Sequence, residues 1–331
     1  MTSQNSIPRR DANRTLRLSI VIPVYRSETT IALLTRLLVA EFASACDLEI
    51  VLVNDGSPDN SAEVCRSLAN EIPQVCFVNL SRNFGEHNAV MAGLNRATGD
   101  CAVIMDDDFQ NPPSEVWKLV DEIQNGRDVV FSRYERKRHS VLRNLGSRFN
   151  NFIASQLLEK PSELYLSSFK AISRFVIDEI IKYDGPYPYI DGLILRTTRN
   201  FACVLVRHEP RAEGQSGYTL RKLVALWLNM STSFSVIPLR LASAAGFLCS
   251  ILGLLFAAGF AIEKLMHPEL PGGWASLIVS LFVIGGIQLF ALGLMGEYLG
   301  RLFLKESGQP QFIIREEISA NDQAKDSRDA A

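Results

Sequence analysis

A short apolar run that ends in three carboxylates, at residues 103–108, constrains this chain more than any other stretch. Its apolar residues are typical of a buried strand, and the prolines at 112–113 prevent that strand from continuing. Because side chains alternate along a strand, Asp106 and Asp108 should point one way and the middle aspartate the other. Like charges repel at such a tip unless a divalent cation with oxygen ligands neutralises them, and Gln110 offers a third oxygen. An acidic turn is the alternative, and the stretch alone does not decide between the two.

Strands and helices alternate up to residue 134, which predicts an α/β fold with a mostly parallel sheet and right-handed crossovers. The predicted strands are 18–25, 48–57, 75–80, 101–105 and 129–134, and the predicted helices are 29–45, 61–70 and 86–97. Parallel sheets bind ligands beyond the carboxyl ends of their strands. Three polar motifs fall at that edge: Pro23–Tyr25, Asp55–Ser57 and Asp106–Asp108. Their coincidence favours a binding site over an acidic turn.

Two uncharged apolar runs, 241–262 and 274–296, are each long enough to cross a bilayer core of about 30 Å. The segment between them is too short for a domain, so the two runs predict a transmembrane hairpin with both ends on one side. Basic residues flank the outer ends, at Arg240, Arg301 and Lys305, whereas the connecting loop has one lysine. The positive-inside rule therefore predicts a multi-pass protein of the inner (cytoplasmic) membrane, with its catalytic part in the cytoplasm.

The remaining segments complete the predicted organisation. Residues 220–237 form an amphipathic pattern typical of a helix in the membrane interface. The predicted parts are a disordered tail at 1–17, a catalytic domain at 18–219 with halves 18–133 and 134–219, the interfacial helix at 220–237, the hairpin at 238–300 and a cytoplasmic tail at 301–331, with a short strand at 310–315.

Charge and cysteine content exclude two classes of protein. A formal net charge of -2 gives no field that would attract nucleic acid. The 6 cysteines include no Cys-x-x-Cys pair and lie mostly in apolar surroundings, which indicates reduced core residues and no disulfide framework. The basic segment at 133–148 is typical of a solvated helix face, and a cationic wall toward a phosphate or lipid headgroup is the alternative.

Seven motifs together resemble one known family. They are Pro23–Tyr25 with Glu28, Asn54–Ser57, Arg82–Gly85, Ala97–Asp100, Asp106–Pro113, the set Gly214, Ser216 and Tyr218, and Gly296–Arg301. The chain resembles the family 2 inverting glycosyltransferases of the GT-A fold, and within them the polyprenyl-phosphate glycosyltransferases. That group includes dolichyl-phosphate mannose synthase and the bactoprenol glucosyltransferases. The resemblance covers about residues 18 to 315.

The resemblance implies roles for the residues at the predicted site. The nucleotide would be held by Pro23, Tyr25, Glu28, Asp55 and Asp106. Asp106 and Asp108, helped by Gln110, would bind Mg²⁺ or Mn²⁺, and Arg133 would lie near the donor phosphates. The acceptor phosphate would be held by Lys170, Arg211, Ser216 and Lys222.

The sequence also departs from the family pattern. One extra residue precedes Glu28, so the acid that meets the nucleotide is open. Leu164 stands where many relatives have an aspartate, and Lys170 stands in place of an arginine, which keeps the charge but not the fork geometry. The change at Leu164 suggests an altered acceptor or sugar contact. No Gln-x-x-Arg-Trp motif of the processive synthases is found, which favours a single transfer per acceptor.

The implied reaction moves a sugar from a nucleotide-sugar, with UDP preferred, to an undecaprenyl-phosphate-like lipid for a cell-envelope glycan or lipid. A lipid phosphate is already an anion, so no general base is nominated, and His87 and His139 are interpreted as structural or surface residues. A homo-oligomer, such as a tetramer, is expected. Two alternatives stay open. One is an inactive membrane scaffold or lipid-carrier translocation subunit, and the other is a nucleotidyltransferase, which the missing Gly-rich phosphate loop disfavours.

Overall fold

The computed structural model describes residues 15–134, 164, 166–209, 237–266 and 273–319. These residues belong to two compact units, an α/β domain that includes residues 310–319, and a helical unit that includes 237–266 and 273–309. The predicted N-terminal tail up to residue 14, the interfacial segment 220–236, and residues His139, Arg211, Ser216 and Lys222 lie outside the described residues.

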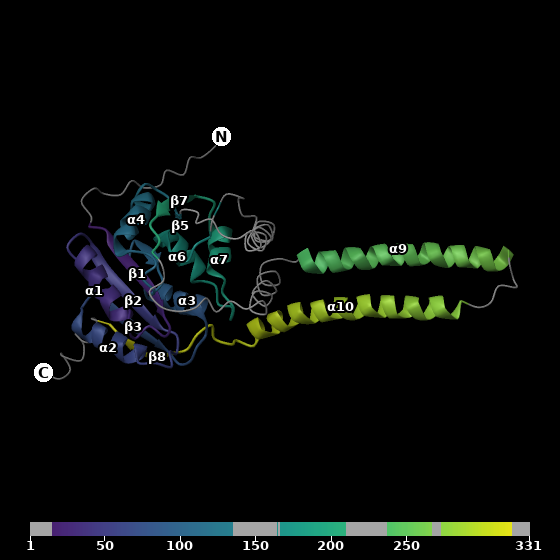
Figure 1. Ribbon diagram of the computed structural model, residues 1–331, viewed down its shortest axis with the longest axis horizontal. Helices are drawn as coiled ribbons and strands as arrows, with labels where there is room; N and C mark the ends of the chain where they lie inside the picture. The colour runs from purple at the N-terminus through teal and green to yellow at the C-terminus, as the bar shows by residue number, and fades with distance from the viewer. Residues whose placement is uncertain (1–14, 135–163, 165, 210–236, 267–272, 320–331) are drawn as a thin grey trace. The chain divides into compact units, whose positions relative to one another are not determined.

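The α/β domain is built on a mostly parallel sheet, as predicted (Figure 1). In the described residues its order is β7-β5-β6-β4-β1-β2-β3-β8. The strands are β1 (Arg17–Val24), β2 (Asp47–Asn54), β3 (Val75–Leu80), β4 (Cys101–Ile104), β5 (Val129–Tyr134), β6 (Lys170–Ser173), β7 (Phe201–Val206) and β8 (Ile314–Ile318). Antiparallel pairing is made by β6, with β4 and β5, and by β8, with β3.

Helices connect and cover the strands. They are α1 (Ile31–Phe42), α2 (Ser61–Glu71), α3 (Glu86–Arg96), the 3-10 helix η1 (Pro113–Glu115), α4 (Val116–Gln124), α6 (Arg174–Ile180) and α7 (Ile190–Thr197). The three helices predicted from periodicity are α1, α2 and α3, and their positions are confirmed. The predicted α1 range of 29–45 was too long at both ends, because Thr30 and Ala43 flank the helix as its caps.

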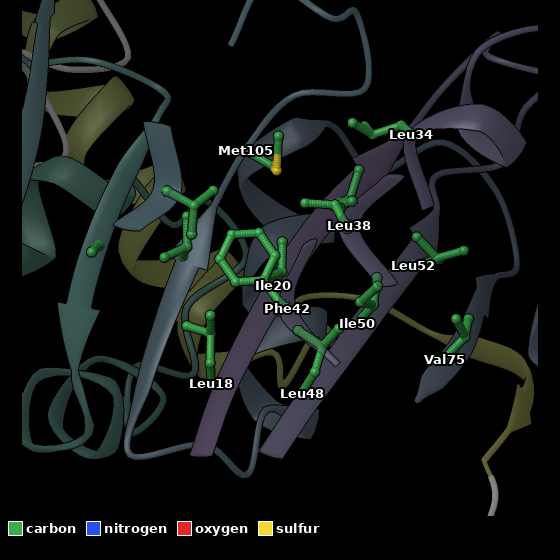
Figure 2. Close-up of a cluster of buried hydrophobic side chains, with 14 of the residues drawn as sticks. Leu18, Ile20, Leu34, Leu38, Phe42, Leu48, Ile50, Leu52, Val75 and Met105 are labelled. Atoms are coloured by element: carbon green, nitrogen blue, oxygen red, sulfur yellow. The ribbon is translucent and has the colours of Figure 1, made fainter. Parts of the chain in front are cut away.

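One face of the sheet packs against α1 in a dense apolar core (Figure 2). Leu18 and Ile20 of β1 point toward Leu38 and Phe42 of α1, and all four are essentially inaccessible to solvent. The strand leading to the carboxylates contributes Cys101, Val103 and Met105 to the same core. Since side chains alternate, Ile104 and Asp106 belong to the opposite face. The core therefore sets which aspartate faces which side of the sheet.

The opposite face is covered by α3, which approaches the sheet closely at Gly93. A Cβ atom there would lie 2.4 Å from Cγ1 of Val21 and 3.1 Å from Cγ2 of Val53. Glycine is thus required for α3 to pack directly on β1 and β2. This close packing holds the first turn of α3, at Glu86 and His87, over the edge where the strands end.

The C-terminal strand differs from its prediction. A strand was expected at 310–315, but β8 is Ile314–Ile318 and pairs antiparallel with β3, with Phe77 opposite Ile318 and Leu80 opposite Ile314. Periodicity missed its second half because Glu316 and Glu317 are charged. Each is ion-paired with an arginine of a helix, so charge here supports the strand.

The helical unit consists of α9 (Ile237–Met266) and α10 (Trp274–Glu306), which lie side by side (Figure 1). Both predicted apolar runs are therefore helical, and α10 extends six residues into the segment predicted as a tail. Large apolar side chains on both helices are exposed, including Phe247, Leu255, Leu265, Leu281, Leu289 and Phe303. Among the described helices, one stretch is long and apolar enough to cross a membrane, Val283–Leu304, and α9 contains a shorter apolar stretch at Ala242–Gly253.

Candidate active site

The three carboxylates lie just beyond β4 and point to different sides of the sheet. Oδ2 of Asp106 accepts a hydrogen bond from the Ser168 hydroxyl at 2.6 Å. Asp107 instead accepts a hydrogen bond from the hydroxyl of Ser27, in the loop that leads to α1. The alternation predicted from sequence is therefore confirmed for these two residues.

A strained turn brings Gln110 back beside the carboxylates. Phe109 has a φ of 59°, which is rare for a bulky residue and marks a constrained backbone. The backbone N–H of Gln110 donates to Oδ1 of Asp108 at 3.1 Å. Its backbone carbonyl accepts the N–H of Glu209 at 2.9 Å, which fastens the turn to the chain after β7. The backbone of Gln110 is thus fixed beside Asp108, and the predicted role of both side chains toward a metal stays a prediction.

His208 lies beside the candidate site, which the sequence did not reveal. Its Nε2 atom lies 3.3 Å from Nε2 of Gln110, and its ring centroid lies 4.2 Å from that of Tyr134. The Tyr134 hydroxyl in turn donates to Oδ1 of Asn111 at 3.2 Å. The only signal in the sequence is that His208 closely follows a strand, and β7 was not among the predicted strands. The pairing of β7 with β5 is what brings His208 close to Tyr134.

Negative charge is concentrated at this edge. The pKa of Asp107 is raised to about 6, first by burial and then by the charges of Asp106 and Asp108, against the hydrogen bond from Ser27. The pKa of Glu86 is also raised, by the protein packed around its carboxyl group and then by the charge of Asp106, although the residue as a whole is exposed. A cation here would relieve the repulsion that both carboxyl groups feel.

The donor set at this edge fits a hard divalent cation. Asp106, Asp108 and Gln110 offer oxygen atoms, which Mg²⁺ and Mn²⁺ accept. Within the described residues, no three His, Cys, Asp or Glu side chains converge to form a complete metal cage. Mg²⁺ is usually held by one or two carboxylates, with water and substrate phosphate in its other positions, so this donor set is compatible with such a cation.

Tyr25 stands exposed at the carboxyl end of β1. Its side chain is 45% exposed, and the Arg26 guanidinium lies 5.6 Å from its ring centroid. Arg26 has a φ of 59°, and its backbone N–H donates to the Ser57 hydroxyl at 3.1 Å. Pro23, two residues earlier, is partly buried within β1. Tyr25 is thus exposed beside the end of β2 with Arg26 over its ring, and its predicted contact with a nucleotide stays a prediction.

Asp55 organises a neighbouring loop. Its two carboxylate oxygens accept the backbone N–H groups of Phe84 at 2.7 Å and Gly85 at 2.9 Å. Burial raises the pKa of Asp55 despite these two hydrogen bonds. Asp55 therefore fixes the loop that opens α3, and its predicted contact with a nucleotide stays a prediction.

Glu28 closes a different loop. Its Oε2 atom accepts the backbone N–H of Asn60 at 2.9 Å, and its own backbone N–H donates to Oδ2 of Asp59 at 3.3 Å. Glu28 is exposed, and it contacts the residue that precedes α2. The residue is thus anchored near the β2 end, and its predicted role toward the nucleotide is likewise untested.

Lys170 is buried in an internal ion pair. Its ammonium group contacts Oδ1 of Asp191, in the first turn of α7, and the two side chains are 5% and 12% exposed. Its Nζ atom also lies 5.6 Å from the ring centroid of Phe131. This pairing was not foreseen, because it joins β6 to a helix that the sequence pattern did not locate. A direct contact of Lys170 with an acceptor phosphate stays a prediction.

Arg133, His87 and Leu164 are also placed by the structure. Arg133 is exposed near the end of β5, and its predicted contact with the donor phosphates stays a prediction. The His87 ring meets the Tyr189 ring edge-on at 5.3 Å, and burial lowers its pKa, which agrees with a structural role. Leu164 is buried, and the altered acceptor or sugar contact predicted from this position stays a prediction.

Comparison with known proteins identifies the family. Residues 19–181 match the model for Glycosyl transferase family 2. A protein of Yersinia enterocolitica named undecaprenyl-phosphate 4-deoxy-4-formamido-L-arabinose transferase is 32% identical over 94% of this chain and 96% of its own. The chain belongs to glycosyl transferase family 2. A protein of the same name from Pseudomonas fluorescens is 34% identical to this family 2 chain, over 90% of it and 88% of the relative.

This family 2 protein is therefore a glycosyltransferase with a GT-A sheet and flanking helices. Its sheet domain is similar to glucosyl-3-phosphoglycerate synthase from Mycobacterium tuberculosis, with a TM-score of 0.48 and 17% identity over 66% of this chain and 79% of that one. In this glycosyltransferase the carboxylates, Tyr25 and the Asp55 loop all lie at the carboxyl edge of the sheet, as the sequence predicted.

Proposed function

We propose that this glycosyltransferase moves a sugar from a UDP-linked donor to undecaprenyl phosphate, with inversion, at the cytoplasmic face of the membrane. The observation that carries the proposal is the similarity to the named undecaprenyl-phosphate transferases, which extends over nearly the whole chain. It includes both the carboxylate edge and the two apolar helices. The relatives' names favour 4-deoxy-4-formamido-L-arabinose, or a closely related sugar, as the group transferred.

On the donor side, Tyr25 would stack on the base, with Pro23, Glu28 and Asp55 shaping the pocket around the nucleoside. Asp106, Asp108 and Gln110 would hold Mg²⁺ or Mn²⁺, and His208 stands close enough to Gln110 to support that group. The bound cation would neutralise charge on the departing diphosphate. Arg133 would add charge-assisted hydrogen bonds to the same phosphates.

On the acceptor side, the nucleophile would be a phosphate oxygen of the lipid. Because this oxygen is an anion at neutral pH, the protein has to orient and desolvate it, and no residue has to remove a proton. Arg211, Ser216 and Lys222 are proposed to hold this phosphate. Lys170 would contribute positive charge toward this phosphate while it stays paired with Asp191. Asp191 stands on the same side of the sheet as Asp106.

The two helices α9 and α10 would form the membrane hairpin. Exposed apolar side chains on both helices support this assignment, because an aqueous surface rarely carries so much apolar area. The basic residues Arg240, Arg301 and Lys305 flank the outer ends of the apolar runs. By the positive-inside rule, both ends of the hairpin would lie in the cytoplasm. The protein would thus be a multi-pass inner-membrane enzyme, and we expect a homo-oligomer such as a tetramer.

A panel of nucleotide-sugars tests the proposal. Purified protein is incubated with undecaprenyl phosphate and each donor, and both the lipid product and the released nucleotide are identified. We expect UDP and a lipid-phosphate sugar with one donor of the formamido- or amino-pentose class. Release of pyrophosphate would indicate a nucleotidyltransferase, and no turnover with any donor would indicate a scaffold or carrier subunit.

A further inference from the structure

Three residues of the site come into one row when the register of β6 with β4 and β5 is continued two residues past the paired strands. In the β4–β6 pairing Ile104 is opposite Lys170, so continuing the antiparallel register by two residues places Asp106 opposite Ser168. In the β5–β6 pairing Phe131 is opposite Lys170, so the same step places Arg133 opposite Ser168. Directly opposed residues of antiparallel strands share a face of the sheet. Ser168 thus stands between the proposed metal ligand and the proposed phosphate ligand.

The hydrogen bond between Ser168 and Asp106 agrees with the Asp106–Ser168 part of this register. The Ser168 hydroxyl donates to Oδ2 of Asp106 at 2.6 Å, a short distance typical of a hydrogen bond to a charged carboxylate. One carboxylate oxygen is therefore oriented by the protein, and the rotation of the whole carboxylate group is restricted. A carboxylate that is already held in one orientation loses less conformational entropy when it binds a cation.

Ser168 is itself held firmly on both sides. Ser167 precedes it in the chain, and its hydroxyl accepts hydrogen bonds from the backbone N–H and the hydroxyl of Ser132, at 3.1 and 2.9 Å. The Ser167 hydroxyl also donates to the backbone carbonyl of Phe169 at 2.8 Å. Two residues after Ser168, Lys170 is fastened to Asp191 by the buried ion pair. The segment that carries Ser168 is therefore fixed to β5 and to α7, so its hydroxyl is a rigid support.

We propose that Ser168 is a positioning residue that orients Asp106 toward the divalent cation. This inference rests on the proposed function, which assigns Asp106 to the metal. Residues that orient metal ligands typically contribute about 10–100-fold to metal affinity. Loss of the Ser168 hydroxyl should therefore weaken the cation site directly, before any sugar is bound, and should raise the metal concentration needed for half-maximal transfer.

The test measures Mn²⁺ binding to the purified full chain by electron paramagnetic resonance of the free ion, without donor or lipid. We expect Ser168→Ala to weaken Mn²⁺ binding about tenfold. Ser168→Thr keeps a hydroxyl and should restore most of the affinity. Ser173→Ala is the matched control, because Ser173 follows on the same antiparallel segment and its buried hydroxyl has no hydrogen-bond partner among the residues that the structure describes. Thermal unfolding of each variant separates a local effect from loss of the fold.

The outcomes distinguish this inference from the proposed function. If Ser168→Ala binds Mn²⁺ like the wild type while Asp108→Asn does not, the metal site stands and the role of Ser168 is wrong. If Ser168→Ala and Ser173→Ala weaken binding equally, the effect is one of general packing, which also overturns the inference. If the wild type binds no Mn²⁺ either alone or with UDP added, the metal assignment in the proposed function is wrong, and the role of Ser168 is wrong with it.

Discussion

Arg66 of α2 and Glu316 of β8, which are 250 positions apart in the chain, form a two-pronged ion pair. Nε of Arg66 donates to Oε1 of Glu316 at 2.9 Å and Nη2 donates to Oε2 at 2.7 Å. Their side chains are 28% and 33% exposed, so solvent screens the pair only partly. The pair fastens the strand that follows the long helices to the edge of the sheet domain.

Glu316→Gln should lower the free energy of unfolding of the sheet domain by about 1–2 kcal/mol, because charge-assisted hydrogen bonds in a two-pronged geometry are lost. Thermal or denaturant unfolding of the purified protein measures the change. Glu71→Gln is the control. It breaks the Arg36–Glu71 pair, whose side chains are 57% and 53% exposed and whose removal should cost well under 1 kcal/mol. Equal effects of the two variants would contradict the prediction.

The same pair predicts a pH dependence. The hydrogen bonds from Arg66 lower the pKa of Glu316 in the folded protein. A carboxyl group with a lowered folded pKa stabilises the fold above its unfolded pKa, near 4.5, and the contribution is lost as the pH falls through the folded pKa. The stability difference between wild type and Glu316→Gln should therefore be constant near neutral pH and should shrink below about pH 4.5.

Asp108→Asn should remove most transferase activity, because it withdraws one of two carboxylates from the proposed cation. A chelator should abolish transfer by the wild type, and Mn²⁺ or Mg²⁺ should restore it. Product formation with the best donor from the panel measures both effects. Asp121→Asn, on the exposed face of α4, is a matched control and should keep full activity. Undiminished turnover by chelated wild type would show that no metal is needed.

Gly56→Ala should disrupt the edge of the site that the Asp55 loop forms. A Cβ at Gly56 would lie 2.5 Å from backbone atoms of both Arg82 and Asn83, and its φ of +61° is also unfavourable for alanine. We expect a loss of about 2 kcal/mol or more in unfolding free energy and weakened UDP binding, read by calorimetry.

Gly126→Ala provides the control for that prediction. Its φ of +92° is also left-handed, but a Cβ there would have no atom within 4 Å. It should therefore lose stability through backbone strain alone and bind UDP like the wild type. If Gly126→Ala lowers UDP affinity as much as Gly56→Ala, the close contact with Arg82 and Asn83 is not the cause.

Arg211→Ala and Lys222→Ala should weaken use of the lipid phosphate and leave UDP binding nearly intact. A partly desolvated charge-assisted contact contributes roughly 1.5–3 kcal/mol, which is about ten- to a hundredfold in kcat/KM for the lipid. Steady-state kinetics with lipid and donor varied in turn measures both effects. If these cations only attract anionic lipid, the defect should shrink at high salt, whereas a specific clamp should keep it.

A cysteine placed at Gly273 should react with an impermeant thiol reagent added outside the cell, and one at Gln309 should not. Both positions are exposed and stand at opposite ends of α10. The native cysteines are replaced first, because Cys203 and Cys249 are exposed. Permeabilised cells, in which both sites should react, are the control. The reverse labelling pattern would overturn the proposed orientation of the hairpin.

The sequence predicted the parts of the site whose placement depends on local pattern. Strand–helix alternation predicted the parallel sheet, and the motifs at Tyr25, Asp55 and Asp106 were assigned to one edge because parallel strands end on the same side. Alternation along β4 also predicted correctly that Asp106 and Asp107 face opposite ways. The six cysteines were only partly as expected, since Cys46, Cys65 and Cys101 are buried but Cys203 and Cys249 are exposed.

Other features were decided only by tertiary structure. Ser168 is opposite Asp106, His208 stands beside Gln110 and Lys170 pairs with Asp191 because β6, β7 and α7 pack where they do. β8 pairs with β3, and its two glutamates form ion pairs with Arg66 and Arg96, which lie far away in the sequence. The spacing of apolar residues along the sequence predicts which face of a helix or strand is buried. The register between distant strands depends on contacts that no local pattern contains, and those contacts determine which polar groups meet at the site.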